Sequence, residues 1–162
     1  MTQADPSIEQ FVRGALGCGC PDDVFLSVEL SAQPATPGRP GYQRLLIGQR
    51  LLICIVEPEG TQGLAEAVRA LAAEGRAQRD ALGLNRFRLV VALDVAEAAR
   101  AAAAAAFHAV AGGDERAHLH LLAPTELPAV LSSRGTRDLQ SAGTGPRHPG
   151  PRPLADQGSP ST

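Results

Sequence analysis

The sequence is poor in the residues and segments that mark several large classes of protein. It has no Lys and no Trp, one Tyr and four Phe, and no apolar run near the roughly 20 residues that a membrane-spanning helix needs. The first ten residues lack the basic and apolar segments of a secretory signal. A formal net charge of −2 argues against a nucleic-acid partner. We therefore expect a cytoplasmic protein that binds neither a membrane nor nucleic acid.

Cysteine is scarce as well, and the three cysteines of the chain are too few for a disulfide scaffold. Two of them, however, stand one residue apart in the sequence Cys18-Gly19-Cys20-Pro21. Flanking glycines let the backbone turn so that both sulfur atoms can face one point. This CxC pair is the most unusual chemical feature of the sequence.

The pattern of apolar residues divides the chain into a folded part and a tail. Residues 1–131 carry the regular apolar spacing of one α/β domain. Residues 132–162 hold five of the thirteen prolines and only two large aliphatic residues, which predicts a disordered tail. Four Arg against two Asp give this tail a charge of +2. Because the whole chain has a net charge of −2, residues 1–131 carry a net charge of −4.

The expected elements follow the order α-β-β-β-α-β-α-β, which predicts one mixed β-sheet with helices packed on it. They are helix 6–16, strands 24–30, 42–47 and 50–57, helix 61–82, strand 87–93, helix 95–111 and strand 117–122, with a short helix over 125–131. Asp22 and Asp23, directly after Pro21, could instead open a helical turn in place of the start of the first strand. Asp5-Pro6 is typical of a helix start, and Asp94 with Glu97 has the spacing of a capping box. Residues 51–56 are apolar on both faces, as in a central strand.

In topology this order resembles the αβββαβ core of the restriction-endonuclease-like nucleases, and the ribonuclease-H-like order βββαβαβ also fits. The PD-(D/E)xK motif of the former family is missing. Glu57 and Glu59 follow the third strand without a paired Asp, and no Lys exists to complete the motif. The resemblance therefore concerns the fold and does not imply nuclease chemistry.

Two histidines could complete a metal site with the CxC pair. His118 and His120 lie two residues apart on an expected strand, so their imidazoles share one face. Together with Cys18 and Cys20 they would form a Cys₂His₂ set suited to zinc or another soft metal. The alternatives are that the two thiols cycle through a disulfide, or that the cysteines only fill space. The third cysteine, Cys54, lies in the central strand and is expected to be inert.

Arginines gather along the helix over 61–82 and the strand that follows it. Arg76, Arg79, Arg86 and Arg88 are candidates for binding an anion or an acidic partner. Acidic residues interspersed among them, and the absence of Lys, also fit an ordinary solvated surface.

No complete catalytic constellation is present, so the sequence favours a non-enzymatic protein. A carboxylate–metal hydrolase would have to use Glu57 and Asp94. The main hypothesis is a small thiol protein that binds a soft metal or undergoes thiol–disulfide exchange. The alternative is a protein-interaction module in which the Cys18–Pro21 loop is structural, and the sequence is compatible with a protein partner or a homodimer.

Overall fold

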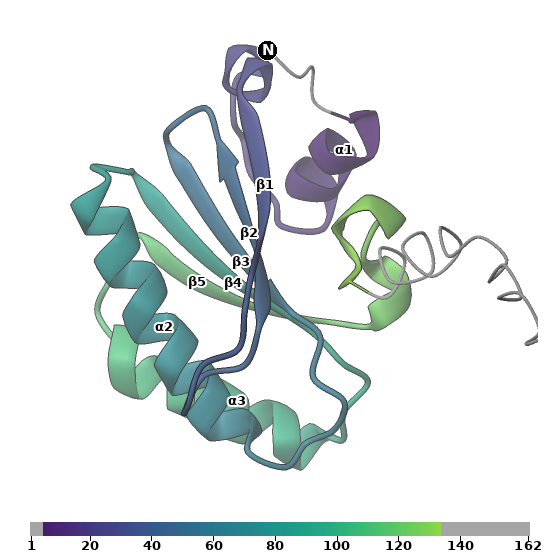
Figure 1. The fold of residues 1–162 in the computed structure, drawn as a ribbon, viewed down its shortest axis with the longest axis vertical. Coiled ribbons are helices and arrows are strands. Elements are labelled where there is room, and N and C mark those ends of the chain that lie inside the picture. Colours follow the sequence, from purple (N-terminus) through teal and green to yellow (C-terminus); the bar gives the residue numbers. More distant parts are fainter. Residues whose placement is uncertain (1–4, 134–162) are drawn as a thin grey trace, which may run out of the picture.

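A five-stranded mixed sheet runs through the computed structural model, which describes residues 5–133 (Figure 1). Its strands lie side by side in chain order. They are β1 (Val28–Gln33), β2 (Tyr42–Ile47), β3 (Leu51–Val56), β4 (Arg86–Ala92) and β5 (Ala117–Leu122). β2 is antiparallel to both neighbours, whereas β3, β4 and β5 are parallel. The predicted fold class, a single mixed sheet with packed helices, is confirmed.

The helices cover the two faces of the sheet unequally (Figure 1). α2 (Leu64–Ala81) and α3 (Glu97–Ala111) pack on one face and on each other. The opposite face carries α1 (Pro6–Gly14) and three short 3₁₀ turns, η1 (Asp22–Leu26), η2 (Pro124–Glu126) and η3 (Ala129–Leu131). None of the helices within residues 5–133 has the length and apolar character needed to cross a bilayer.

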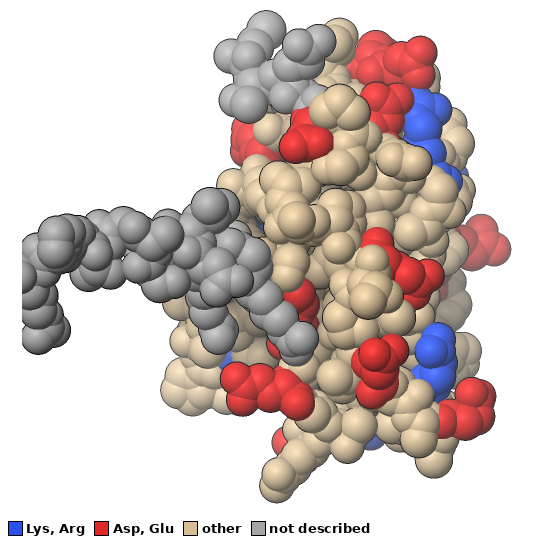
Figure 2. Space-filling model, turned by 90° about the vertical axis from the view of Figure 1, so that its right-hand side faces the viewer, with Lys and Arg blue, Asp and Glu red and all other residues tan. Residues whose placement is uncertain are grey.

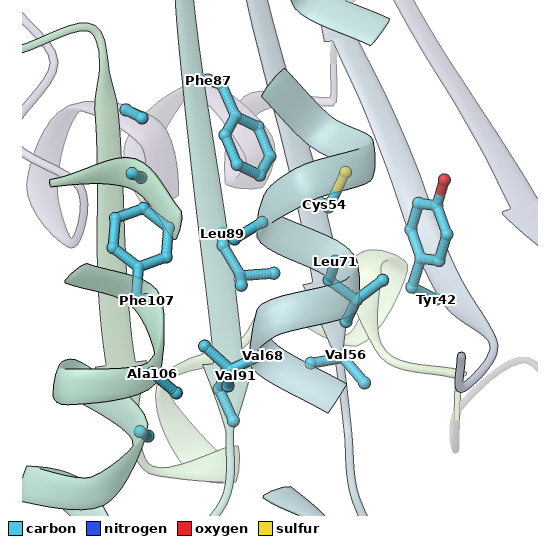
Figure 3. Packing of buried hydrophobic residues seen from close by; sticks show 14 of the residues in the cluster. Tyr42, Cys54, Val56, Val68, Leu71, Phe87, Leu89, Val91, Ala106 and Phe107 are labelled. Atoms are coloured by element: carbon cyan, nitrogen blue, oxygen red, sulfur yellow. The ribbon is translucent and has the colours of Figure 1, made fainter. Parts of the chain in front are cut away.

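The face under α2 and α3 is a closed apolar layer. Its core is built from large side chains of both helices and of β3 and β4, including Val56, Val68, Leu71, Phe87, Leu89 and Phe107 (Figure 3). α2 approaches the sheet most closely at Gly75, where an added Cβ would lie 2.1 Å from the ring of Phe87. Only glycine allows this approach, which sets the spacing between helix and sheet.

The β2–β3 hairpin closes through the turn that the sequence predicts. Gly48 and Gln49 both have positive φ angles of 57° and 53°, and the Arg50 N–H donates to the Ile47 carbonyl at 3.0 Å. Two left-handed central residues match the right-handed twist of the flanking strands. β3 is buried along its whole length, as expected for a central strand.

Three local predictions were wrong. Residues 22–26 form η1 rather than the start of a strand, because Val24 and Phe25 are both buried while Leu26 is 66% exposed. α3 begins after Ala96 with no side-chain cap, so Asp94 does not cap it. The helix expected over 61–82 spans only Leu64–Ala81; Leu82, beyond its end, is 51% exposed, whereas Leu84 is buried.

Other predictions agree with the structure. The Asp5 side chain accepts a hydrogen bond from the Ser7 N–H and caps α1, as the Asp5-Pro6 pair predicts. β2 and β5 have the expected bounds. The predicted tail from residue 134 onward lies outside the described residues, whereas Ser132 and Ser133 are described and contact Glu57.

Candidate functional site

The loop that carries Cys18 and Cys20 is fixed at its start by the end of α1. The Cys18 N–H donates to the Val12 carbonyl at 3.1 Å, which folds the chain back after the helix. Gly17 makes this turn with a φ of 62°, a conformation that glycine adopts without strain. The Leu16 carbonyl accepts a hydrogen bond from the guanidinium of Arg88, on β4, at 2.5 Å. The loop is therefore anchored to the sheet as well as to α1.

Cys18 and Cys20 form a disulfide across the single residue Gly19. Their Cα atoms are 5.3 Å apart, within the usual range for bonded cysteines. Cys18 is buried, with 6% of its surface exposed, whereas Cys20 is only half-buried. Cys20 is therefore the more accessible of the two cysteines.

The segment after the disulfide packs against the β2–β3 hairpin turn. A Cβ at Gly48 would lie 2.7 Å from Val24 of η1, so the turn and η1 are in close contact. Asp22 is paired with Arg13 of α1 at 2.5 Å, and the Arg13 guanidinium also lies over the Phe25 ring. These contacts hold the far end of the loop in place.

A pocket of about 270 Å³ lies directly beside the disulfide. One wall is the Cys18–Pro21 loop, and the other comes from the start of β3 and β4, with Arg50, Asn85 and Arg86. Among the residues that the structure describes, no Asp or Glu lines it. Within residues 5–133, neither Arg50 nor Arg86 forms an ion pair. The pocket therefore combines a disulfide with two uncompensated positive charges.

The structure places the two histidines together but not with the cysteines. His118 and His120 share one face of β5, as predicted; His118 is exposed, and His120 Nε2 lies 2.8 Å from Arg88 Nη1. Burial, then the charges of Arg88 and His118, lowers the pKa of His120 to about 4. Burial, followed by the charge of Arg86, lowers the pKa of Arg88.

The predicted Cys₂His₂ set is not assembled. Among residues 5–133 no group of three or more His, Cys, Asp or Glu side chains could hold a metal ion. His120 instead accepts from Arg88 as a neutral imidazole, and the two sulfurs are bonded to each other. Nothing in the described part of the chain supplies the further ligands that zinc requires.

Two of the four predicted anion-binding arginines are engaged elsewhere. Arg79 is 1% exposed and pairs with Asp114 at 2.8 Å and with Asp80 at 2.9 Å, and Arg76 also pairs with Asp114. Burial would raise the pKa of Asp114, but hydrogen bonds from Arg79, the Arg116 N–H and Arg76 lower it to about 2. Arg76 and Arg79 thus tie α2 to the loop before β5, whereas Arg86 lies in the pocket and Arg88 beneath the loop.

The carboxylates considered for hydrolysis do not form a site either. Glu57 accepts hydrogen bonds from the Ser132 hydroxyl at 2.8 Å and from the Ser133 N–H at 2.7 Å. It thereby holds the chain after η3 against the end of β3. Asp94 is exposed, and neither belongs to a cluster of metal-ligating side chains within the described residues.

Cys54 differs from the other two cysteines in being free and in packing on the other face of the sheet. It is 1% exposed under α2, among the apolar side chains of Figure 3. Burial, with a smaller contribution from the charge of Glu74, raises the pKa of its thiol to about 12. It is a packing residue, as the sequence predicts.

A second concavity, of about 860 Å³, lies between α1, η1 and β1. Three of the four exposed large aliphatic side chains within residues 5–133 line it, namely Leu26, Leu30 and Val130. Asp5, Glu9 and Asp22 lie on its rim. Acidic side chains also predominate on the face that carries α1 and the C-terminal turns (Figure 2).

Neither a family model, nor a curated protein, nor a solved structure matches this chain. The site therefore stands on its own geometry. Arg50 and Asn85 carry no sequence signal, because they reach the pocket only through the parallel pairing of β3 with β4, in which Leu51 faces Arg86.

Proposed function

We propose that Cys18 and Cys20 form a redox-active pair that accepts and releases two electrons by thiol–disulfide exchange. The observation that carries this proposal is the position of the bond. It joins residues two apart in sequence, links no separate elements of the fold, and lies on the rim of a pocket with its Cys20 end accessible. Such a bond is poorly suited to stabilising the fold and well placed for reaction.

The size of the closed loop supports this function. A disulfide stabilises a protein mainly by restricting its unfolded chain, and the effect grows with loop length. For a three-residue loop it amounts to about 1.5 kcal/mol, below the 2–4 kcal/mol of ordinary structural disulfides. The loop is also held by the Cys18 N–H bond to Val12 and by the Arg88 bond to Leu16, which remain available after reduction.

The charges around the sulfurs also favour exchange. A thiolate is the reactive form of cysteine, and neighbouring Arg side chains stabilise it. Arg50 and Arg86 line the same pocket as both sulfurs, and Asp22 is compensated by Arg13. Asp23, exposed at the start of η1, opposes this effect in part.

The test is a redox titration of the full chain. The protein is equilibrated in thiol–disulfide buffers of known potential, free thiols are alkylated, and the mass is measured. We expect a two-electron transition at a potential above about −300 mV, the level below which structural disulfides lie. A pair that stays oxidised below that potential, or stays reduced in every buffer, contradicts the proposal.

Three variants complete this titration. Cys18→Ser and Cys20→Ser should each abolish the transition. Cys54→Ser is the matched control and should leave it unchanged, because Cys54 is buried in the other core.

A second candidate, a protein-interaction module, is favoured by the groove between α1, η1 and β1. Exposed apolar side chains beside acidic ones suit a partner segment that is both apolar and basic. The outer edge of β1 pairs with no other strand in the described chain, so an extended partner segment could pair with it. A labelled peptide of alternating Arg and Val residues is the probe, read by fluorescence anisotropy. Leu30→Ser should weaken its binding, whereas the exposed Leu82→Ser should not; equal binding by all three proteins contradicts this candidate.

A further inference from the structure

We propose that the pocket beside the Cys18–Cys20 disulfide selects small thiols that carry a carboxylate, and that Arg50 and Arg86 recognise that carboxylate. This inference rests on the redox function proposed above and adds the chemical class of its substrate. It depends on three features of the pocket: its charge, its rigid arginine wall and the unequal exposure of its sulfurs.

Arg50 and Arg86 differ in their pairing from the arginines around α2. Around α2, Arg76 and Arg79 are neutralised by Asp114, and Arg39 pairs with Glu74 at 3.0 Å. Arg50 and Arg86 have no acidic partner within residues 5–133, although both lie at the surface of the same small pocket. Their charge is therefore available to a ligand.

The backbone holds these two arginines side by side. The Arg50 carbonyl accepts hydrogen bonds from the N–H groups of Asn85, at 2.8 Å, and Arg86, at 3.1 Å. Arg50 directly precedes β3 and Arg86 is the first residue of β4, and these two strands pair with each other. Two guanidinium groups on a fixed wall suit a planar carboxylate, which accepts paired N–H bonds from arginine. At about 270 Å³ the pocket is slightly smaller than the usual range for ligand sites, so it suits a small molecule.

The exposure of the sulfurs defines the order of bond changes. The thiolate of the small molecule attacks the Cys20 sulfur, forms a mixed disulfide with it and breaks the bond to Cys18. Cys18 leaves as a thiolate and takes a proton from water. A second small thiol then attacks the mixed disulfide, which yields the oxidised small disulfide and the Cys20 thiol. Two thiols are thus oxidised while the protein disulfide is reduced, and the reverse sequence reoxidises the protein.

The experiment compares three small thiols that differ in charge: 3-mercaptopropionate, 2-mercaptoethanol and cysteamine. The rate of disulfide reduction in the full chain is measured by alkylation and mass, and is divided by the thiolate concentration. Each rate is then divided by that for an oxidised peptide of residues 15–23, which cancels the intrinsic reactivity of each thiol. We expect 3-mercaptopropionate to exceed 2-mercaptoethanol by about fivefold and cysteamine to fall below it, as for exposed ion pairs.

Two variants assign the preference to the pocket. The double variant Arg50→Gln/Arg86→Gln should bring the three normalised rates to within about twofold of one another. Arg69→Gln, an exposed arginine of α2, is the matched control and should keep the preference. Thermal unfolding of each variant confirms that it is folded.

The outcomes distinguish the carboxylate preference from the redox function on which it rests. If no thiol reduces the disulfide of the folded protein, the redox function itself is overturned. If all three thiols reduce it at equal normalised rates, the redox function stands and the carboxylate preference is overturned. A preference lost equally in Arg69→Gln would show a general effect of charge, and that result also overturns the role of Arg50 and Arg86.

Discussion

Two pairs of arginines, Arg76 with Arg79 and Arg50 with Arg86, use their charge in opposite ways. On the face covered by α2 and α3, which we call the closed face, Arg79 is buried and shares Asp114 with Arg76. The ion pairs of these two arginines join α2 to the loop before β5. On the α1 side, Arg86 and Arg50 form no ion pair with any acidic residue of 5–133 and lie next to a disulfide. The difference shows that position and pairing, rather than the number of arginines, separate a structural charge from one that is free to bind.

The largest expected effect comes from breaking the buried ion pair. Asp114→Ala leaves Arg79, 1% exposed, with only the exposed Asp80 as a partner, and should lower the free energy of unfolding by about 3 kcal/mol. Arg86→Gln, on the opposite face, should change it by less than about 0.5 kcal/mol. Urea denaturation measures both values. Similar losses in the two variants would remove the distinction between the faces.

The tight packing of the closed face gives the next effect. Gly75→Ala places a methyl group 2.1 Å from the Phe87 ring, and the resulting shift of α2 should cost about 1–3 kcal/mol. Gly14→Ala, at the exposed end of α1, meets no atom within 4 Å and should stabilise the protein by about 0.5 kcal/mol. Urea denaturation tests whether the free energy of unfolding falls in Gly75→Ala and rises in Gly14→Ala. An unchanged free energy of unfolding in Gly75→Ala would contradict the close approach of α2 to the sheet.

Reduction of the disulfide should have a smaller effect, of about 1.5 kcal/mol, because the closed loop has only three residues. Thermal unfolding with and without a reductant measures it, and Cys18→Ser/Cys20→Ser provides the permanently reduced reference. A loss above 3 kcal/mol would indicate that the disulfide is structural. The α1 face would then depend on this bond for stability, as the closed face depends on the ion pairs of Asp114.

The smallest effect concerns pH. His120 has a pKa of about 4 in the folded chain and an ordinary value of 6.5, so between these values the unfolded chain binds a proton that the folded chain does not. Stability should therefore fall as pH drops from 6.5 to 4, by about 1 kcal/mol after allowance for partial exposure, and stay level above 6.5.

His120→Asn should flatten this slope, and His108→Asn, on α3, should leave it intact. Asp114, with its pKa of about 2, acts in a separate window below pH 4, where its protonation removes the pairing with Arg79. A slope between pH 4 and 6.5 that persists in His120→Asn would assign the effect to another group.

A structural feature could be predicted from the sequence where neighbouring residues in the chain determine it. Apolar periodicity and turn residues set the sheet strands, so β2 and β5 were predicted with their bounds. The same reasoning misplaced residues 24–26, because alternating apolar residues fit a strand and a 3₁₀ turn alike. The spacing of Asp94 and Glu97 predicted a cap at Asp94, whereas α3 begins at Glu97, after Ala96, without a side-chain cap.

The candidate site was predicted only in part for the same reason. The Cys18–Cys20 pair is visible in sequence because its geometry is local. The free charge of Arg86 could not be told from that of Arg79, because the difference lies in Asp114, which is distant in sequence. Arg50 carried no sequence signal at all, since only the pairing of β3 with β4 brings it to the pocket.

The hydrogen bonds from Asn85 and Arg86 to the Arg50 carbonyl have a further consequence for motion. These amide protons can exchange with solvent only when the entrance to β3 and β4 opens, so their exchange rates report the integrity of one wall of the pocket. The opposite wall is the Cys18–Pro21 loop, and its covalent structure would change in each cycle of the proposed thiol–disulfide exchange. The pocket thus has one static and one adaptable side, and deuterium exchange can time them separately.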